Sequence, residues 1–421
     1  MYWHNYWKIE VIYLFLYILI VSFKILRFML EREIKLVKDN KKAAIVCMGT
    51  RISLNSKNVR SVDLIYLRNI LQDVYGRTVD YLTLKTKKEA DLDYFKNVAD
   101  ENINDYDEIY IYNASLNPFG GIFKTESIIT FQKLFDFTGD IWYFLCDPKM
   151  PCTDMAQYIK SRLVNNRVKT DNEAGYIEIT PEFCDEWSSK VYPKIKIASA
   201  GCNYNMYYET YTNKLTKNGT KKPANTKNVL NPDYEWAFLP LFEYYAIQED
   251  LDAKLKDYPF EDRKYDLIYF WNNRQTERNK IIEKFYNRED YNYNYVLGFD
   301  PDWSIVNYSC GPYVKHDEMF EVIPKSAKAT LVLGDTLHNN NTRTPRFFEA
   351  MLLDIVAFIY IDYDKDKRFL TNEFLKDFCY VSTPEELVEK YNKIKNDEEL
   401  FRKIVKLQRE DIISQFKKYF D

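Results

Sequence analysis

The chain has 421 residues, a length that suits two domains of ordinary size. Hydrophobic residues make up 46% of it and the formal net charge is −4, which excludes global disorder and a global basic field that would attract nucleic acid. Seven cysteines without paired spacing and only three histidines argue against a zinc site and favour reduced thiols in a cytoplasm.

The first forty residues contain an uncharged run from Val11 to Phe23, which is shorter than the roughly 20 residues of a membrane span. Residues 9–30 reach that length if Lys24 and Arg27 extend to the interface, and the cationic stretch that follows would keep the rest of the chain on the cytoplasmic side. No small-residue cleavage site follows the run. We therefore expect an N-terminal hydrophobic helix in residues 1–42. It is either a membrane anchor, an added amphipathic helix or an upstream extension without a role.

Residues 43–250 alternate short β-rich runs with helical stretches. The spacing of apolar residues predicts a helix at 63–74. Apolar runs predict strands at 43–48, 81–84, 108–112, 141–146 and 195–198. This alternation indicates an α/β domain, in which helices cover both faces of a parallel sheet.

A charged segment at 249–264 suits a hinge, and a second alternation begins after it. Strands are predicted at 267–271, 293–298, 329–333 and 356–361. Helices are predicted at 275–285, 346–353, 384–396 and 398–419. The fold class is therefore α/β, with two doubly wound, Rossmann-like domains.

Asp147 directly follows the predicted strand at 141–146 and precedes a proline. In open α/β sheets, ligands and catalytic groups collect just past the carboxyl ends of strands, so a carboxylate here is a candidate general base. The residue pattern alone also fits a helix cap or a turn. Both interpretations stay open on spacing.

Several motifs together resemble the T-even phage DNA β-glucosyltransferase family, which moves glucose from UDP-glucose onto 5-hydroxymethylcytosine in DNA. The resemblance covers roughly residues 43–421 in the family's order and leaves residues 1–42 outside. Its motifs are AAIVCMGT (43–50), DLIYL (63–67), NDYDEIYIYNASLNPFGG (104–121), YFLCDPKMP (143–151), IKIASAGCN (195–203), DLIYFWNNRQTER (266–278) and LVLGDTLHNNNTRTPRFFEAM (331–351).

This resemblance implies the GT-B arrangement, in which two Rossmann-like domains face a cleft. It divides the chain into an acceptor (DNA)-binding domain at 43–255, a UDP-glucose-binding domain at 256–405 and a C-terminal helix at 406–421 that packs back on the first domain.

Arg274 and Arg278 lie four residues apart at the start of a predicted helix, so both are on one face beside free N–H groups. Two guanidinium groups at a helix N-terminus suit a diphosphate, and by resemblance both match the family's diphosphate-binding arginines. Without the resemblance, a solvated helix face is the plain alternative. One departure is that residues 270–272, Phe-Trp-Asn, replace a Gly-Gly-Ser turn of the family.

The resemblance assigns four further donor contacts. Arg346 would reach the diphosphate, and Glu349, one helical turn later, would accept the ribose hydroxyls. The alternative for this pair is an i,i+3 surface ion pair. Asp335 would contact the glucose hydroxyls, and Val314 or Lys315 would lie beside the uracil.

The resemblance also makes Asp147 the general base of an inverting transfer, with Asp63 in place of a glutamate that helps to position the substrates. A divalent ion, Mg²⁺ or Mn²⁺, is compatible with the diphosphate, but the matching loops carry no Asp-x-Asp metal motif. His338 replaces a family tyrosine, and we predict no catalytic role for it.

The acceptor is expected to be duplex DNA with a hydroxymethylated pyrimidine, whose base must be turned out of the helix. In this family the loop that enters the DNA corresponds to Asn117, Pro118, Phe119 and Gly120. The cationic residues Lys217, Lys221 and Lys222 either grip phosphates or belong to a solvated insertion.

The leading hypothesis is thus a UDP-glucose-dependent DNA β-glucosyltransferase, monomeric and in a host cytoplasm. The alternative is a membrane-tethered glycosyltransferase of the same fold that acts on a lipid- or protein-linked glycan. Residues 1–30 favour the alternative, and the loop at 117–121 disfavours it.

Overall fold

The structure is a computed structural model that describes residues 36–46, 59–83, 94–112, 125–145, 180–200, 235–241, 244, 251–270, 276–290, 292–296, 310–311, 318–334 and 343–417. The predicted hydrophobic helix therefore lies outside the described residues, apart from its last few positions. Within these ranges, no helix combines the length and the apolar character that crossing a membrane would require.

The first sheet has seven parallel strands in the order β3-β2-β1-β4-β5-β6-β7. The order reverses between β1 and β4, which makes this a doubly wound sheet. Its strands are β1 (Lys42–Val46), β2 (Thr78–Thr83), β3 (Phe95–Asn97), β4 (Glu108–Tyr112), β5 (Asp140–Leu145), β6 (Ile195–Ser199) and β7 (Trp236–Phe238).

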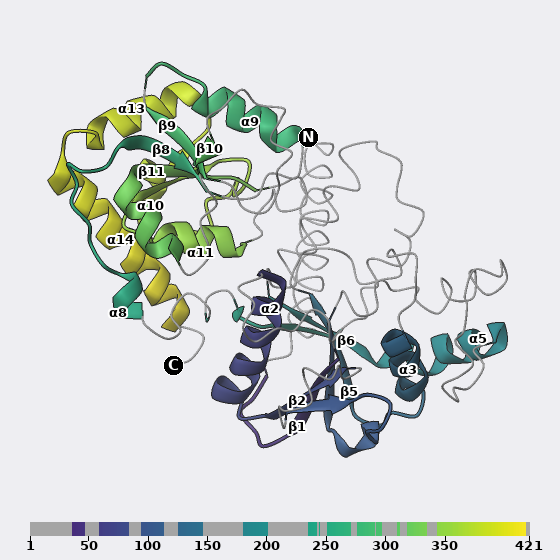
Figure 1. Ribbon diagram of the computed structural model, residues 1–421. Coiled ribbons are helices and arrows are strands. Elements are labelled where there is room, and N and C mark those ends of the chain that lie inside the picture. Colours follow the sequence, from purple (N-terminus) through teal and green to yellow (C-terminus); the bar gives the residue numbers. More distant parts are fainter. Residues whose placement is uncertain are drawn as a thin grey trace, which may run out of the picture.

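Helices cover both faces of this sheet (Figure 1). Because side chains alternate along a strand, Tyr110 of β4 joins the core cluster that contains Leu64 and Leu67, whereas Ile109 joins the cluster that contains Phe131. The helices are α2 (Val59–Asn69), which ends in the π-helical turn η2 (Ile70–Val74), α3 (Thr125–Leu134) and α5 (Pro181–Lys190), with 3₁₀ turns η3 (Ile103–Asp105) and η7 (Tyr192–Lys194).

The second sheet repeats this plan with six parallel strands in the order β10-β9-β8-β11-β12-β13. Its strands are β8 (Tyr265–Tyr269), β9 (Tyr293–Val296), β10 (Cys310–Gly311), β11 (Ala327–Val332), β12 (Val356–Tyr360) and β13 (Tyr380–Val381). The helices of this half are α8 (Leu251–Lys254), α9 (Thr276–Tyr286), α10 (Met319–Ser326), α11 (Pro345–Leu352), α12 (Glu373–Cys379), α13 (Pro384–Ile394) and α14 (Glu398–Lys417).

The predicted strands and helices recur in the structure with shifted ends. The helix predicted at 63–74 begins four residues earlier, at Val59, and its last turn is π-helical. The strand predicted at 267–271 begins at Tyr265 and already ends at Tyr269. Short elements such as β3, β7 and β13 were missed because two or three residues are too few to show a period.

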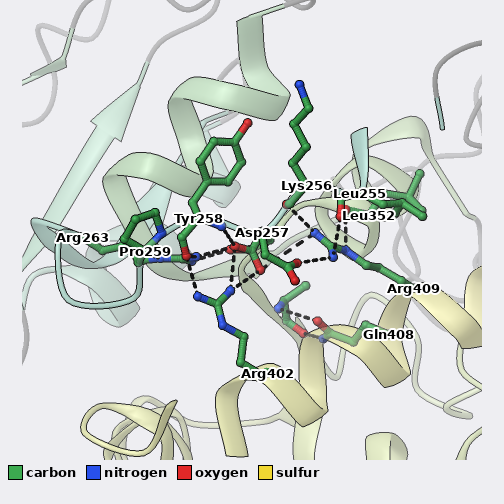
Figure 2. A network of polar contacts seen from close by, with 12 residues as sticks. Leu255, Lys256, Asp257, Tyr258, Pro259, Arg263, Leu352, Arg402, Gln408 and Arg409 are labelled. Atoms are coloured by element: carbon green, nitrogen blue, oxygen red, sulfur yellow. Dashed lines mark hydrogen bonds and ion pairs between the residues drawn. The ribbon is translucent and has the colours of Figure 1, made fainter. Parts of the chain in front are cut away.

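The segment predicted as a hinge is held firmly where the structure describes it (Figure 2). Asp354, fully buried, accepts hydrogen bonds from Arg263 at 2.5 Å and from Arg402 of α14 at 2.9 and 3.0 Å. Arg409 of α14 donates to the Leu255 carbonyl at 3.1 Å and to the Asp257 carboxylate at 2.8 Å. These bonds tie residues 255–263 to the last helix, so this part of the segment is not a free linker.

α14 also reaches the first half of the chain. Its Phe416 stacks on Tyr244, with ring centroids 6.4 Å apart, and the Tyr244 hydroxyl donates to Asp73 in η2. The helix is continuous through residues 405 and 406, where the sequence analysis placed a boundary. The contact with Tyr244 therefore involves the end of a helix that begins on the second sheet.

The buried carboxylate gives the first prediction. Asp354→Asn should lower the free energy of unfolding by about 3–5 kcal/mol, because it leaves buried arginine charge without its partner. Urea unfolding measures the loss. The control is Glu389→Gln, which removes one exposed ion pair with Lys393 on α13 and should leave the urea midpoint unchanged. Equal midpoints for both variants would contradict the role of Asp354.

Candidate functional site

In the sequence, most of the predicted site residues follow the carboxyl ends of β4 and β5 in the first sheet and of β8 and β11 in the second. In the first sheet, Asp147 lies two residues beyond the end of β5, and the loop at 117–120 follows β4. In the second sheet, Asp335 lies three residues beyond the end of β11. This is where open α/β sheets bind ligands.

Many of the predicted residues themselves lie outside the described part of the chain. For Asp63 the structure describes the backbone in α2, the helix that follows β1, but not the side chain. The residues outside the description are Asn117, Pro118, Phe119, Gly120, Asp147, Lys217, Lys221, Lys222, Arg274, Val314, Lys315, Asp335 and His338. Their roles stay predictions.

Arg278 is the third residue of α9, in the turn that follows β8. Only 3% of it is exposed. An arginine is rarely buried without a purpose, because its charge must be compensated. The buried side chain excludes the solvated helix face that the residue pattern alone allowed for Arg278.

Arg346 and Glu349 both lie on α11, the helix between β11 and β12, which begins at Pro345. Glu349 is buried, with 7% exposure, and Arg346 is half-buried. An exposed i,i+3 ion pair, the plain alternative for these residues, therefore does not describe Glu349.

The first turns of α9 and α11 share one edge of the second sheet. β8 and β11, the strands that precede them, are neighbours in parallel register, with Leu267 opposite Ala329 and Ile268 opposite Thr330. The switch point therefore gathers partial positive charge from two helix N-termini and full positive charge from the guanidinium groups of Arg278 and Arg346. This combination suits a diphosphate, and the buried Glu349 beside it suits paired hydroxyl groups.

The structure adds two residues at this edge that the sequence analysis did not single out. Thr344 immediately precedes α11, and its hydroxyl lies 2.7 Å from the hydroxyl of Tyr363, which follows β12. Both side chains are buried. No sequence signal pairs residues 19 positions apart, and only the packing of β12 beside β11 brings them together.

The described ranges contain no group of three or more histidine, cysteine, aspartate or glutamate side chains that could hold a metal ion.

Comparison with known proteins points to the same family as the sequence motifs. The model of the bacteriophage T4 beta-glucosyltransferase family matches residues 41–175. The DNA beta-glucosyltransferase of Enterobacteria phage T4 is 24% identical over 383 residues, which cover 89% of this chain and 95% of that protein. The resemblance stated from the sequence is thereby confirmed.

Solved structures agree in fold. T4 phage BGT in complex with its UDP-glucose substrate aligns with a TM-score of 0.61 and 20% identity over 90% of this chain and 96% of that one. T4 phage BGT in complex with UDP and Mn²⁺ aligns with a TM-score of 0.62 and 21% identity over 90% and 97%. The predicted α/β class and GT-B arrangement are confirmed.

The buried and half-buried arginines generate the second prediction. Arg278→Ala and Arg346→Ala should each weaken UDP binding by roughly 1.5–3 kcal/mol, the range for hydrogen bonds to charged groups. Isothermal titration calorimetry with UDP measures the change. Lys284→Ala, which removes an exposed cation from the last turn of α9, is the matched control and should bind UDP as the wild type does. Unchanged affinity in both arginine variants would remove them from the donor site.

Proposed function

We propose that this chain, a relative of bacteriophage T4 β-glucosyltransferase in sequence and fold, is a UDP-glucose-dependent DNA β-glucosyltransferase. It transfers glucose, with inversion, to the hydroxyl of 5-hydroxymethylcytosine or 5-hydroxymethyluracil in duplex DNA. The observation that carries the proposal is the pair of helix N-termini at the switch point of the second sheet, where Arg278 and Glu349 are buried and Arg346 is half-buried.

On the donor side, Arg274, Arg278 and Arg346 bind the diphosphate and hold its charge as UDP leaves. Preorganised cations aimed at a developing charge lower the barrier because they need no rearrangement during the reaction. Glu349 accepts the ribose hydroxyls. Asp335 contacts the glucose hydroxyls, and Val314 or Lys315 lies beside the uracil.

On the acceptor side, Asp147 is the general base. A primary hydroxyl is too weak a nucleophile at neutral pH unless its proton is removed during attack. The hydroxyl oxygen then bonds to the anomeric carbon while the bond to the UDP oxygen breaks on the opposite face. Asp63 helps to position the two substrates, although its side chain is one carbon shorter than the glutamate of the family.

The base must leave the DNA stack before its hydroxymethyl group can react. We propose that Asn117, Pro118 and Phe119 enter the duplex and support the flipped base, and that Gly120 permits the turn of this loop. Because the chain is net acidic, contacts with phosphates must be local, and Lys217, Lys221 and Lys222 are the proposed ones.

This function also sets the proposed division of the chain. Residues 43–255 form the acceptor domain and residues 256–405 the donor domain. Residues 406–421 return to the acceptor side, a proposal supported by the stacking of Phe416 on Tyr244. Mg²⁺ or Mn²⁺ would be held mainly by the diphosphate, and the similar T4 phage BGT forms a complex with UDP and Mn²⁺.

We further infer that the enzyme works as a monomer in the host cytoplasm and that residues 1–42 supply no catalytic group. Any membrane contact through residues 9–30 would tether the enzyme without taking part in the chemistry. The glycan-directed alternative is not favoured, because the relative that matches over 383 residues is a DNA glucosyltransferase.

The proposed function is tested by offering the purified protein radiolabelled UDP-glucose together with hydroxymethylated or plain duplex DNA. Label should appear only in the hydroxymethylated DNA, and alkaline-stable β-linked glucose should be recovered from it. Label in neither DNA, with transfer to a lipid- or protein-linked glycan instead, would favour the alternative.

The third prediction concerns the general base. Asp147→Asn should slow transfer by about 10²–10⁴, the usual contribution of general base catalysis, while the affinity for UDP stays unchanged. Single-turnover transfer and UDP calorimetry on the same preparation separate the two quantities. Near-wild-type turnover would remove Asp147 from the mechanism.

The fourth prediction separates two kinds of DNA contact. Each lost phosphate contact should flatten the dependence of log K on log salt by about 0.9, so neutralising Lys217, Lys221 and Lys222 should lower this slope. Replacing Asn117 and Phe119 by alanine should leave the slope unchanged but reduce transfer, because the flipped base loses its support. A slope that is unaffected by the lysine changes would assign them to a solvated insertion.

A further inference from the structure

Three helices of the described chain begin with the same dipeptide, Thr-Pro, but they use the threonine differently. Before α5, the Thr180 hydroxyl accepts a hydrogen bond from the Phe183 N–H at 3.2 Å. Before α13, the Thr383 hydroxyl accepts from the Glu386 N–H at 3.2 Å. Both threonines are ordinary N-caps, and each satisfies one of the N–H groups that a helix start leaves open.

Thr344, the threonine before α11, makes no such cap. Its backbone is extended like that of the other two, and its carbonyl accepts from the Phe347 N–H at 3.0 Å. Its hydroxyl instead lies 2.7 Å from the hydroxyl of Tyr363. The helix that carries Arg346 and Glu349 is therefore held by a side chain from outside the helix.

Tyr363 is well placed to hold it because the tyrosine is itself immobilised. Its side chain is fully buried, and its ring meets the Phe369 ring edge-on at 4.9 Å. Phe369 in turn packs on Phe347 of α11, also at 4.9 Å. The next residue, Asp364, accepts from the N–H groups of Arg368 at 3.0 Å and Phe369 at 2.7 Å, which closes the loop after β12.

The charge state of Tyr363 fits this role. Burial raises the pKa of Tyr363 well above its usual range, and the nearby Arg346 guanidinium opposes that rise. The phenol is therefore neutral at physiological pH and can hold its hydrogen bond with Thr344.

We propose that Tyr363 is a positioning residue which, through Thr344, fixes the first turn of α11 for binding of the donor nucleotide. The inference rests on the proposed function and assigns to Tyr363 no contact with the substrate. The bond keeps the Thr344 hydroxyl away from the helix N–H groups. By fixing the position and rotation of the helix start, it also sets the directions in which the side chains of Arg346 and Glu349 extend.

Calorimetry with UDP tests the proposal on Tyr363→Phe and Thr344→Val, which each remove one hydroxyl of the pair. Each variant should weaken UDP binding by roughly three- to tenfold, as expected for one hydrogen bond. The double variant should bind no more weakly than either single one, because all three lack the same bond. Thr344→Ser keeps the hydroxyl and should restore wild-type affinity.

Steady-state kinetics supplies a readout that loss of stability alone does not move. In Tyr363→Phe the KM for UDP-glucose should rise by the same factor as the dissociation constant, while the KM for DNA stays unchanged. The matched control is Tyr391→Phe, since Tyr391 is also buried and its hydroxyl bonds to Asp266 at the opposite edge of the same sheet. This variant should bind UDP like the wild type, even if it unfolds at a lower temperature.

Two results would overturn the inference alone. In the first, UDP binding is lost in Arg346→Ala but unaffected in folded Tyr363→Phe and Thr344→Val. In the second, Tyr391→Phe weakens UDP binding as much as Tyr363→Phe does. A wild-type protein that does not bind UDP at all would instead overturn the proposed donor site, and the inference with it.

Discussion

The arrangement of the second half depends on one buried carboxylate. Asp354 lies in the turn between α11 and β12 and receives Arg263 from the segment before β8 and Arg402 from α14. Burial lowers the pKa of Arg263, and the carboxylate of Asp354 opposes this shift. Because one carboxylate fixes three parts of the chain, β8, β12 and the last helix keep a constant relation to one another. Both strands flank β11, so these contacts also hold the starts of α9 and α11, where the donor site is proposed, in a fixed arrangement.

Charged groups at the amino ends of the strands differ in their surroundings from those proposed to bind ligands at the carboxyl ends. At the amino edge of the first sheet, buried Glu108 accepts hydrogen bonds from Arg77, Lys41 and Tyr110, all at 3.1–3.3 Å. These partners satisfy the carboxylate within the protein. At the carboxyl edge of the second sheet, by contrast, the first turns of α9 and α11 carry the proposed site residues Arg278 and Arg346. A parallel sheet produces this division because every strand ends, and every following helix begins, at the same edge.

Tyr363, in the loop after β12, adds a buried contact that supports the proposed site. Tyr363 contacts Thr344 and Phe369, and Phe369 in turn packs on Phe347 in the first turn of α11, so buried side chains support this helix start. Binding groups need such support, because a small displacement of a positioning element costs much of the binding energy. The proposed site thus combines a few groups that meet the ligand with buried neighbours that keep them in place.

Most of the strands and helices, and the resemblance to the T4 β-glucosyltransferase family, could be predicted from the sequence alone. Apolar runs and helical spacing located β4, β5, β12, α9 and α13 because these signals depend on near neighbours in the chain. The motifs identified the relationship and nominated Arg278, Arg346 and Glu349. The fold was needed to show that Arg278 and Glu349 are buried and that Asp354 bonds to Arg263, 91 residues away. The fold also showed that Thr344 bonds to Tyr363 instead of capping its helix. A local pattern predicts on which face of its own helix or strand a residue lies. It does not predict which distant side chain will contact that residue once the sheet has folded.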